Sequence, residues 1–405
     1  MKERKAEINF FNENDLRLEL NKREIDFVEH YRKNRRFTLR ANWIDAIKDG
    51  VHEKLIPDGD YYVIKEGIFK LVHFLHRLKL FLEELKEYNA PASLLQKLEH
   101  CSVFLEHKQF ASVFRNLPKT SSCQKWINLG RLDTFFRIKK KVELEKVLDG
   151  IYMLDVLQSL AELMKNNHYC LANYNDSGSP VFEVEDGFHP FLEKPVKNSF
   201  AFDEGSNICF LTGPNMLGKS TFLKTLGIII YLSHIGFPIP ARLVNTSIQK
   251  GLFTTINLSD NLNLGFSHFY SEVKRVKEMA QDLQSYQRIF VIFDELFKGT
   301  NVKDAFDSTL MVVQALSKIR NSIFFISSHI LEVAEEISNS AKIDFRCFES
   351  MLKDSQAVYD YKLKRGISKE RVGFQIVKNE KIEEILKEVI AAQSQTSLDE
   401  KVMNG

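Results

Sequence analysis

One short stretch constrains the fold of this 405-residue chain more than any other. Residues 213–220 fit the pattern Gly-x4-Gly-Lys-Ser, and they stand between an apolar run that ends at Thr212 and an amphipathic run that begins at Thr221. We expect a buried strand, a glycine turn and a helix, because backbone amides at such a helix start converge on one spot and bind polyphosphate. Lys219 would then reach the β and γ phosphates, and the Ser220 hydroxyl would take one coordination site of Mg²⁺.

Two later stretches supply groups that phosphate chemistry needs and that a chance glycine loop would lack. Residues 289–295 are an apolar run ending in Asp294 and Glu295, which would place one carboxylate on Mg²⁺ and the next beside the attacking water. Residues 323–329 are a second apolar run, ending in His329, which could contact the γ-phosphate. Taken singly, the acids could cap a following helix and the histidine could be hydrogen-bonded in a turn. The order of the three stretches favours nucleotide binding.

Several stretches resemble motifs of the MutS family of DNA mismatch repair ATPases. Residues 212–221 are similar to that family's nucleotide loop, residues 294–301 to its Walker B and D-loop, and residues 328–332 to its Thr-His switch. Upstream, residues 154–162 resemble the end of the family's helical core, and residues 187–190 resemble the motif that opens its ATPase domain.

The resemblance covers roughly residues 140–380 and implies a fold, a chemistry and a set of site residues. The fold would be an α/β P-loop NTPase of the ABC type with a mainly parallel sheet, preceded by an all-α lever and core domain. The chain would be an ATPase that uses ATP and Mg²⁺, with Glu295, His329 and Lys219 as catalytic residues and Ser220 and Asp294 on the metal. The nucleotide loop would comprise Gly213, Pro214, Asn215, Met216, Leu217, Gly218, Lys219, Ser220 and Thr221.

Two more residues take roles from the resemblance, and two depart from it. Ser267 stands in a segment similar to the one whose serine reaches the partner subunit's nucleotide, and Tyr361 stands near the place of an aromatic residue or histidine against adenine. Core packing explains a tyrosine at 361 equally well. Leu217 and Phe297 replace glycines that are usual in the family. We expect both residues to change packing beside the site. They should therefore affect the rate of ATP turnover more than nucleotide binding.

The resemblance also implies partners. These are double-stranded DNA, mismatched or branched, a second copy of the chain in a homodimer with composite ATP sites, and a MutL-like repair protein. Full mismatch sensors of the family carry an N-terminal reader domain, a connector and a clamp, and we expect too little room for all of these before residue 181. Two functions therefore stay open: a MutS-like ATPase of mismatch repair, and a dimeric ATP-dependent switch acting on branched DNA, RNA or protein. A metabolite kinase fits the motifs less well.

The first part of the chain reads as helical. Apolar spacing of three and four predicts a long helix that ends near Pro91, and Ser93 could cap the next one. A further helix is expected over residues 142–164. The seam of the long helix is Ile68, Leu71, Leu75, Leu78, Leu82 and Leu85.

The turn-rich residues 173–180 mark the predicted domain boundary. The domains would be a helical core over residues 1–172, an ATPase domain over 181–379, and a charged helix with a polar, mobile tail over 380–405. Within the ATPase domain, residues 267–281 should be helical, with Phe269, Val273 and Val276 facing inward.

Two basic clusters could contact phosphates, although a solvated helix face is the commoner explanation. The first covers residues 31–37, where Tyr31 or Phe37 could stack on bases, and the second covers residues 137–141 after Phe135 and Phe136.

Composition limits the remaining classes of function. A formal net charge of +2 gives no overall field toward nucleic acid or an anionic membrane, so such contacts must come from local patches. Five dispersed cysteines without a Cys-x-x-Cys pair indicate reduced thiols in a cytoplasmic protein and argue against a zinc site. We expect no signal peptide and no membrane-spanning segment.

Overall fold

The computed structural model describes residues 1–33, 59–108, 110, 124–175, 180–202, 205–214, 217–256, 268–353, 356–368 and 381–390. The chain divides into two compact units, Met1–Asn167 and His168–Gly405. Each is described by itself.

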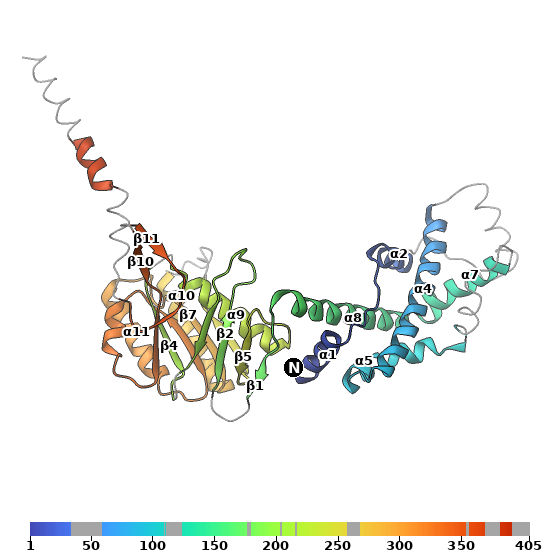
Figure 1. Ribbon diagram of the computed structural model, residues 1–405, viewed down its shortest axis with the longest axis horizontal. Helices are drawn as coiled ribbons and strands as arrows, with labels where there is room; N and C mark the ends of the chain where they lie inside the picture. The colour runs from blue at the N-terminus through green and yellow to red at the C-terminus, as the bar shows by residue number, and fades with distance from the viewer. Residues whose placement is uncertain are drawn as a thin grey trace, which may run out of the picture. The chain divides into compact units, whose positions relative to one another are not determined.

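All regular secondary structure among the described residues of the first unit is helical, as predicted (Figure 1). Helix α4 packs against α2, α5 and α7, while α8 packs against α1, α5 and a π-helical turn, η1. The predicted seam of α4 is confirmed, because all six of its residues are buried. The elements are α1 (Lys2–Glu13), α2 (Lys22–Lys33), α4 (Gly59–Glu87), α5 (Ala92–Leu105), α7 (Gln124–Thr134), η1 (Phe135–Lys139) and α8 (Lys141–Asn167).

The predicted cap at Ser93 is wrong. Helix α5 begins at Ala92 without a side-chain cap, and the Ser93 hydroxyl instead donates a hydrogen bond to Glu7 Oε1 at 2.8 Å. Lys97 Nζ also lies 2.6 Å from that oxygen. Because the Glu7 side chain is buried, these two partners stabilise a carboxylate that would otherwise be costly inside the unit.

The second unit is built on a six-stranded sheet with the order β12-β9-β4-β8-β7-β6. All neighbouring strands are parallel except β12, which pairs antiparallel with β9, so the predicted mainly parallel sheet is confirmed. The strands are β4 (Ile208–Thr212), β6 (Gly251–Thr254), β7 (Ile289–Asp294), β8 (Ile323–Ser327), β9 (Ile343–Cys347) and β12 (Lys364–Arg365).

A smaller four-stranded sheet has the order β1-β5-β2-β3. Its first strand places Asn173 and Tyr174 beside Asn245 and Thr246 of β5. Part of the stretch predicted as a domain boundary is therefore a strand of the second unit, which begins at His168. The strands are β1 (Asn173–Tyr174), β2 (Phe182–Gly187), β3 (Asn198–Ala201) and β5 (Leu243–Thr246), and a separate hairpin consists of β10 (Ser350–Lys353) and β11 (Gln356–Tyr359).

Each face of the large sheet buries its own apolar cluster, because successive side chains of a strand point to opposite sides. Cys209 and Leu211 of β4 join the cluster under α9 (Lys219–Ile235) and the small sheet. Ile208 and Phe210 join the cluster under α10 (His268–Tyr286), α11 (Val302–Leu316) and α12 (Leu331–Glu336). The second unit is therefore layered, with helices on both faces of the large sheet.

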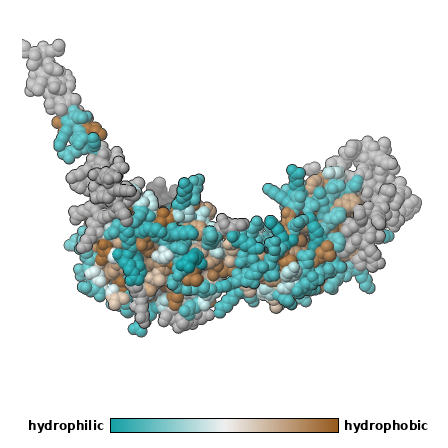
Figure 2. Space-filling view, in the orientation of Figure 1, coloured by the Kyte–Doolittle hydropathy of each residue, from teal (hydrophilic) through white to brown (hydrophobic). Residues whose placement is uncertain are grey.

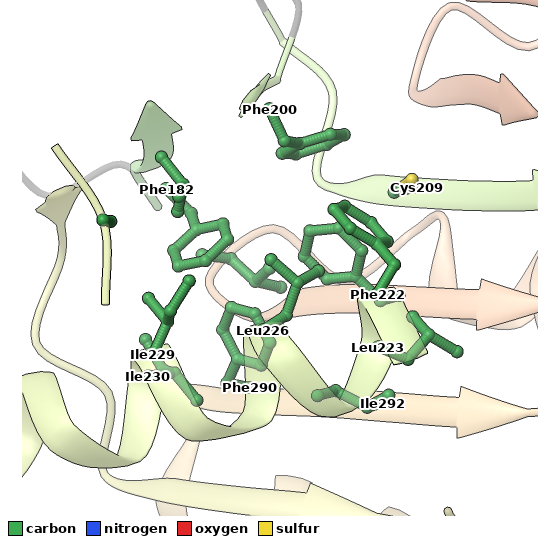
Figure 3. Packing of buried hydrophobic residues seen from close by; sticks show 14 of the residues in the cluster. Phe182, Phe200, Cys209, Phe222, Leu223, Leu226, Ile229, Ile230, Phe290 and Ile292 are labelled. Atoms are coloured by element: carbon green, nitrogen blue, oxygen red, sulfur yellow. The ribbon is translucent and has the colours of Figure 1, made fainter. Parts of the chain in front are cut away.

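Helix α9 buries one face in the cluster that it shares with both sheets. Figure 3 shows its apolar side chains, among them Leu226 and Ile229, directed toward Phe182 of the small sheet and Phe290 of the large one. The rings of Phe182 and Phe290 lie 4.9 Å apart between centroids in an edge-to-face arrangement. This packing fixes the helix whose first turn follows the glycine motif.

The predicted inward face of α10 is partly wrong. Phe269 and Val276 are half-buried against the core, but Val273 is 39% exposed, and Glu272 and Met279 are buried instead. A helix turns 100° per residue, so its buried stripe here passes through Glu272 rather than its neighbour.

The surfaces of both units are mainly hydrophilic on the face seen in Figure 2. No helix among the described residues is long and apolar enough to cross a membrane. Residues 382–390 form a helix whose side chains are all exposed, and the predicted tail beyond it lies outside the described residues.

Candidate nucleotide-binding site

The glycine motif joins β4 to α9 at the carboxyl edge of the large sheet. Gly213 has φ 133° and Gly218 has φ 97°, both in the region that favours glycine. A Cβ atom on Gly213 would lie only 2.6 Å from the carbonyl oxygen of Phe348. Gly218 is the N-cap residue of α9, so its backbone conformation sets the direction of the first helical turn. Asn215 and Met216 lie outside the described residues.

Lys219 is buried against the loop that precedes it. Its ammonium group donates hydrogen bonds to the carbonyl oxygens of Gly213 and Pro214, the latter at 3.1 Å. Burial lowers the pKa of Lys219, while the negative charges of Glu295 and Asp294 oppose that shift. The lysine therefore lies within electrostatic reach of both acids.

The two acids lie at the end of β7, and both are hydrogen-bonded to a residue of β8. The Ser327 hydroxyl donates a hydrogen bond to Asp294 Oδ1 at 2.8 Å, and the Glu295 backbone N–H donates one to Ser327 Oγ at 3.0 Å. Glu295 has φ 59°, a left-handed conformation that is uncommon for glutamate. Sequence reasoning missed Ser327 because its role depends on the register of β7 against β8, which places it beside Asp294.

A pocket of about 340 Å³ opens over the start of α9. Glu295 and Tyr361 lie on its wall together with the motif, so the structure brings these predicted residues together. The other lining residues are Gly187, His189, Leu192, Lys194, Pro195, Val196, Asn198, Pro214, Gly218, Lys219, Ser220, Thr221, Phe222, Thr225 and Phe348.

Tyr361 lies directly beside the motif. A Cβ atom on Gly218 would lie 3.4 Å from a ring carbon of Tyr361. Asn198 holds the backbone of this segment: its Nδ2 donates to the Tyr361 carbonyl oxygen at 3.0 Å, and its Oδ1 accepts from the Leu363 N–H at 2.8 Å. Tyr361 as a whole residue is 42% exposed and lies on the wall of the pocket.

Four described residues among those predicted for the site do not line the pocket: Gly213, Leu217, Asp294 and His329. His329 follows the end of β8 and is exposed, outside the described lining of the pocket. Its neighbour Ser328 is buried and accepts a hydrogen bond from the Ile330 N–H at 3.1 Å. Ser267 lies outside the described residues.

The two departures from the family pattern are both buried. Leu217 belongs to the apolar cluster under α9. Phe297 has φ 60°, and its ring centroid lies 5.8 Å from that of Phe269 on α10. A glycine would adopt this backbone without strain, which explains why a glycine is usual at this position of the family pattern. In this chain, ring packing compensates for the strained backbone.

The residues present fit a magnesium nucleotide. The buried ammonium group of Lys219 has the charge that a phosphate requires, and it lies on the wall of the pocket at the start of a helix. Ser220 and Asp294 offer the oxygen ligands that Mg²⁺ prefers.

In the basic cluster at residues 137–141, Arg137 is engaged inside the first unit, while Lys139 and Lys141 are exposed. Arg137 makes two hydrogen bonds of 2.5 Å to the buried Asp133, whose carboxylate also accepts from the Tyr31 hydroxyl at 2.9 Å. Burial, followed by the negative charge of Asp133, raises the pKa of Tyr31. Tyr31, Phe135 and Phe136 are buried, so none of them can stack on a base. Phe37 lies outside the described residues.

Comparisons with known proteins match the part of the chain that contains most of the pocket's lining. Residues 209–399 match the family model described as MutS domain V. The chain is 30% identical over 240 residues to MutS protein homolog 4 of Mus musculus, covering 56% of this chain and 24% of that protein. It is also 30% identical over 231 residues to the DNA mismatch repair protein MutS of Anaplasma phagocytophilum, covering 56% of this chain and 28% of that protein.

A third relative, the DNA mismatch repair protein MutS of Streptococcus gordonii, is 25% identical over 257 residues, which cover 61% of this chain and 30% of that protein. The chain thus spans about a quarter to a third of the length of these relatives. The match of the family model falls on the half of the chain that contains the pocket.

Proposed function

We propose that this chain, whose residues 209–399 belong to the MutS family as its domain V, couples ATP binding and Mg²⁺-dependent hydrolysis to a switch in a dimer that binds DNA. Domain V is the P-loop ATPase domain of the family. The observation that carries the proposal is the meeting of Lys219, Glu295 and Tyr361 at one pocket. Lys219 and Glu295 lie on segments that follow β4 and β7 of the large sheet, and Tyr361 lies between β11 and β12. Ligands of parallel sheets bind at the carboxyl ends of the strands, where these segments begin.

Each residue has a role that follows from its position. Lys219 would exchange the carbonyl oxygens of Gly213 and Pro214 for phosphate oxygens, a stronger charge-assisted interaction. Ser220 and Asp294 would hold Mg²⁺, which neutralises phosphate charge when bound. Glu295 would orient and deprotonate the attacking water.

The remaining predicted residues complete the site. Tyr361 would stack on the adenine ring, because the residue is half-exposed and its ring lies beside Gly218. His329 would contact the γ-phosphate, which requires that its exposed side chain turn toward the loop when ATP binds.

A second copy would complete the site through Ser267. Mixing Lys219→Ala chains with Ser267→Ala chains tests this arrangement, because a mixed dimer contains one site with both lesions and one with neither. Recovered ATP hydrolysis supports a composite site in a homodimer. Two inactive variants that never complement each other place the site within one chain.

Action in mismatch repair is the leading form of the proposal, with mismatched or branched duplex DNA and a MutL-like protein as partners. The alternative is a dimeric switch acting on branched DNA, RNA or a protein without mismatch recognition. Arg137 and its aromatic neighbours pack inside the first unit, so we assign them no contact with nucleic acid in either function.

A competition experiment at fixed salt with matched and G·T-containing duplexes separates the two functions. We expect weak binding that falls steeply with salt, and a preference for the mismatch below about tenfold, small beside the specificity of sequence-reading proteins. A hundredfold preference would establish a mismatch reader in this chain. We further place the protein in the cytoplasm, because five dispersed cysteines without a Cys-x-x-Cys pair are typical of reduced thiols.

A further inference from the structure

Ser327, the last residue of β8, connects the two acids of the candidate site. It is fully buried, and the parallel register of β7 and β8 places it directly beside Asp294. We propose that Ser327 is a positioning residue that fixes the metal-binding carboxylate of Asp294 and the backbone of Glu295 at the same time. The proposal rests on the proposed function and deepens it, because it concerns how the ATP site is held for Mg²⁺.

The hydrogen bonds at Ser327 determine the direction of its hydroxyl group. The oxygen accepts the Glu295 N–H at 3.0 Å, so its own proton is left to donate, and it lies 2.8 Å from Asp294 Oδ1. Because the side chain has no exposed surface, water does not compete for either bond. A buried donor or acceptor without a partner is costly, so both bonds hold their groups firmly.

Asp294 is held from the strands on both sides. Its backbone N–H donates to Thr255 Oγ1, directly after β6, at 3.4 Å, while its carboxylate accepts from Ser327 on β8. The bond from Ser327 to Oδ1 thus fixes the direction in which the carboxylate presents its oxygens to a cation. Residues that orient a metal ligand in this way strongly affect metal affinity.

Glu295 depends on the same hydroxyl for its backbone. Its φ of 59° lies in the left-handed region, which a glutamate rarely adopts unless neighbouring groups impose it. The Ser327 hydroxyl, which accepts the Glu295 N–H, is one such neighbouring group. Loss of the hydroxyl would therefore disturb both the metal ligand and the general base.

The chain offers a matched control in Ser322, which directly precedes β8. Ser322 is also fully buried, and its hydroxyl oxygen accepts the Ile289 N–H at 3.1 Å at the start of β7. It thus joins the same two strands at their opposite end, away from the pocket. Ser322→Ala removes a comparable buried hydroxyl without touching Asp294 or Glu295.

The experiment measures how much Mg²⁺ is needed for half-maximal binding of ATPγS, together with kcat and KM for ATP. We expect Ser327→Ala to raise that Mg²⁺ concentration about tenfold to a hundredfold and to lower kcat. We expect Ser327→Thr, which keeps the hydroxyl, and Ser322→Ala to stay near the parental values. Ser327→Cys, with similar volume and only a weak donor, replaces the alanine variant where that variant does not fold.

Three outcomes contradict the proposal. One is a folded Ser327→Ala or Ser327→Cys chain with parental Mg²⁺ dependence and kcat. Another is the same shift in Ser322→Ala, which would mean general loosening of the sheet. The third is a parental chain that binds no ATPγS at all, which would overturn the proposed ATP site itself. A shift confined to the Ser327 variants that lack the hydroxyl supports the proposal.

Discussion

Lys219 Nζ donates a hydrogen bond to the Pro214 carbonyl oxygen at 3.1 Å, so the lysine folds back onto its own loop. The Gly213 carbonyl accepts from the same group. These neutral oxygens stabilise a buried ammonium group only in part, because burial lowers its pKa. An incoming phosphate would offer the same group a full negative charge, and this exchange makes the lysine central to nucleotide binding.

Glu295→Gln is expected to retain ATP binding and lose hydrolysis. The amide fills the same volume at the wall of the pocket, but it cannot take a proton from water. Loss of a general base lowers turnover by about a hundredfold to ten-thousandfold. Single-turnover hydrolysis assays check this, with the exposed Glu336→Gln as control. Parental turnover in Glu295→Gln would show that another group acts as the base.

Asn198→Ala is expected to weaken ATP binding and leave inorganic tripolyphosphate binding unchanged. The substitution removes the two hydrogen bonds that hold the Tyr361–Leu363 turn, so the ring beside Gly218 loses its support. At about 1 kcal/mol for each bond, the affinity for ATP should fall by up to roughly thirtyfold.

The control for this prediction is Asn173→Ala, which removes a hydrogen bond to Asn245 on the small sheet. Calorimetric titration of each variant with both ligands gives the four affinities. Equal losses for ATP and tripolyphosphate in Asn198→Ala would mean that the turn supports the phosphate loop rather than the base.

Local sequence patterns predicted those features that depend on neighbouring residues. Apolar spacing predicted the seam of α4, whose residues are buried. The Gly-x4-Gly-Lys-Ser pattern predicted the loop, whose two glycines adopt positive φ. The features that sequence missed depend on pairing between distant segments. Ser327 gains its role from strand register, and Arg137 loses the predicted one because Asp133 and Tyr31 meet it inside the helical unit.

Arg137→Ala is expected to destabilise the first unit rather than to weaken DNA binding selectively. It leaves the Asp133 carboxylate, which has no exposed surface, with Tyr31 but without its guanidinium partner. Breaking a buried ion pair on one side costs about 3–5 kcal/mol. Urea denaturation measures the loss, and Asp133→Asn in the same chain should recover part of it. Unchanged stability together with weaker DNA binding would restore the phosphate-contact hypothesis.

His234 is expected to make the second unit less stable in acid. Its Nδ1–H donates to the Ile230 carbonyl oxygen at 2.8 Å, and its Nε2 accepts the Gln249 N–H at 2.8 Å, so the neutral ring satisfies both partners. Burial lowers its pKa from the usual value of 6.5. Above pH 6.5 the ring is neutral in the folded and in the unfolded chain. Below pH 6.5 the unfolded chain binds a proton more readily than the folded chain, in which the pKa of His234 is lower.

Stability should therefore fall as the pH drops through and below about 6.5. Urea midpoints measured across that range, for the parental chain and for His234→Gln, isolate the contribution of this ring. Parallel curves for the two proteins would show that other groups cause the acid sensitivity.

The most direct test of the ATP site is calorimetric titration of ATP into the full chain and into Lys219→Ala, with the exposed Lys318→Ala as control. The parental chain and Lys318→Ala should bind ATP alike. Removal of a charge-assisted contact worth about 1.5–3 kcal/mol should weaken binding by Lys219→Ala roughly tenfold to a hundredfold or more. Equal affinities in all three proteins would contradict the assignment of this pocket to ATP.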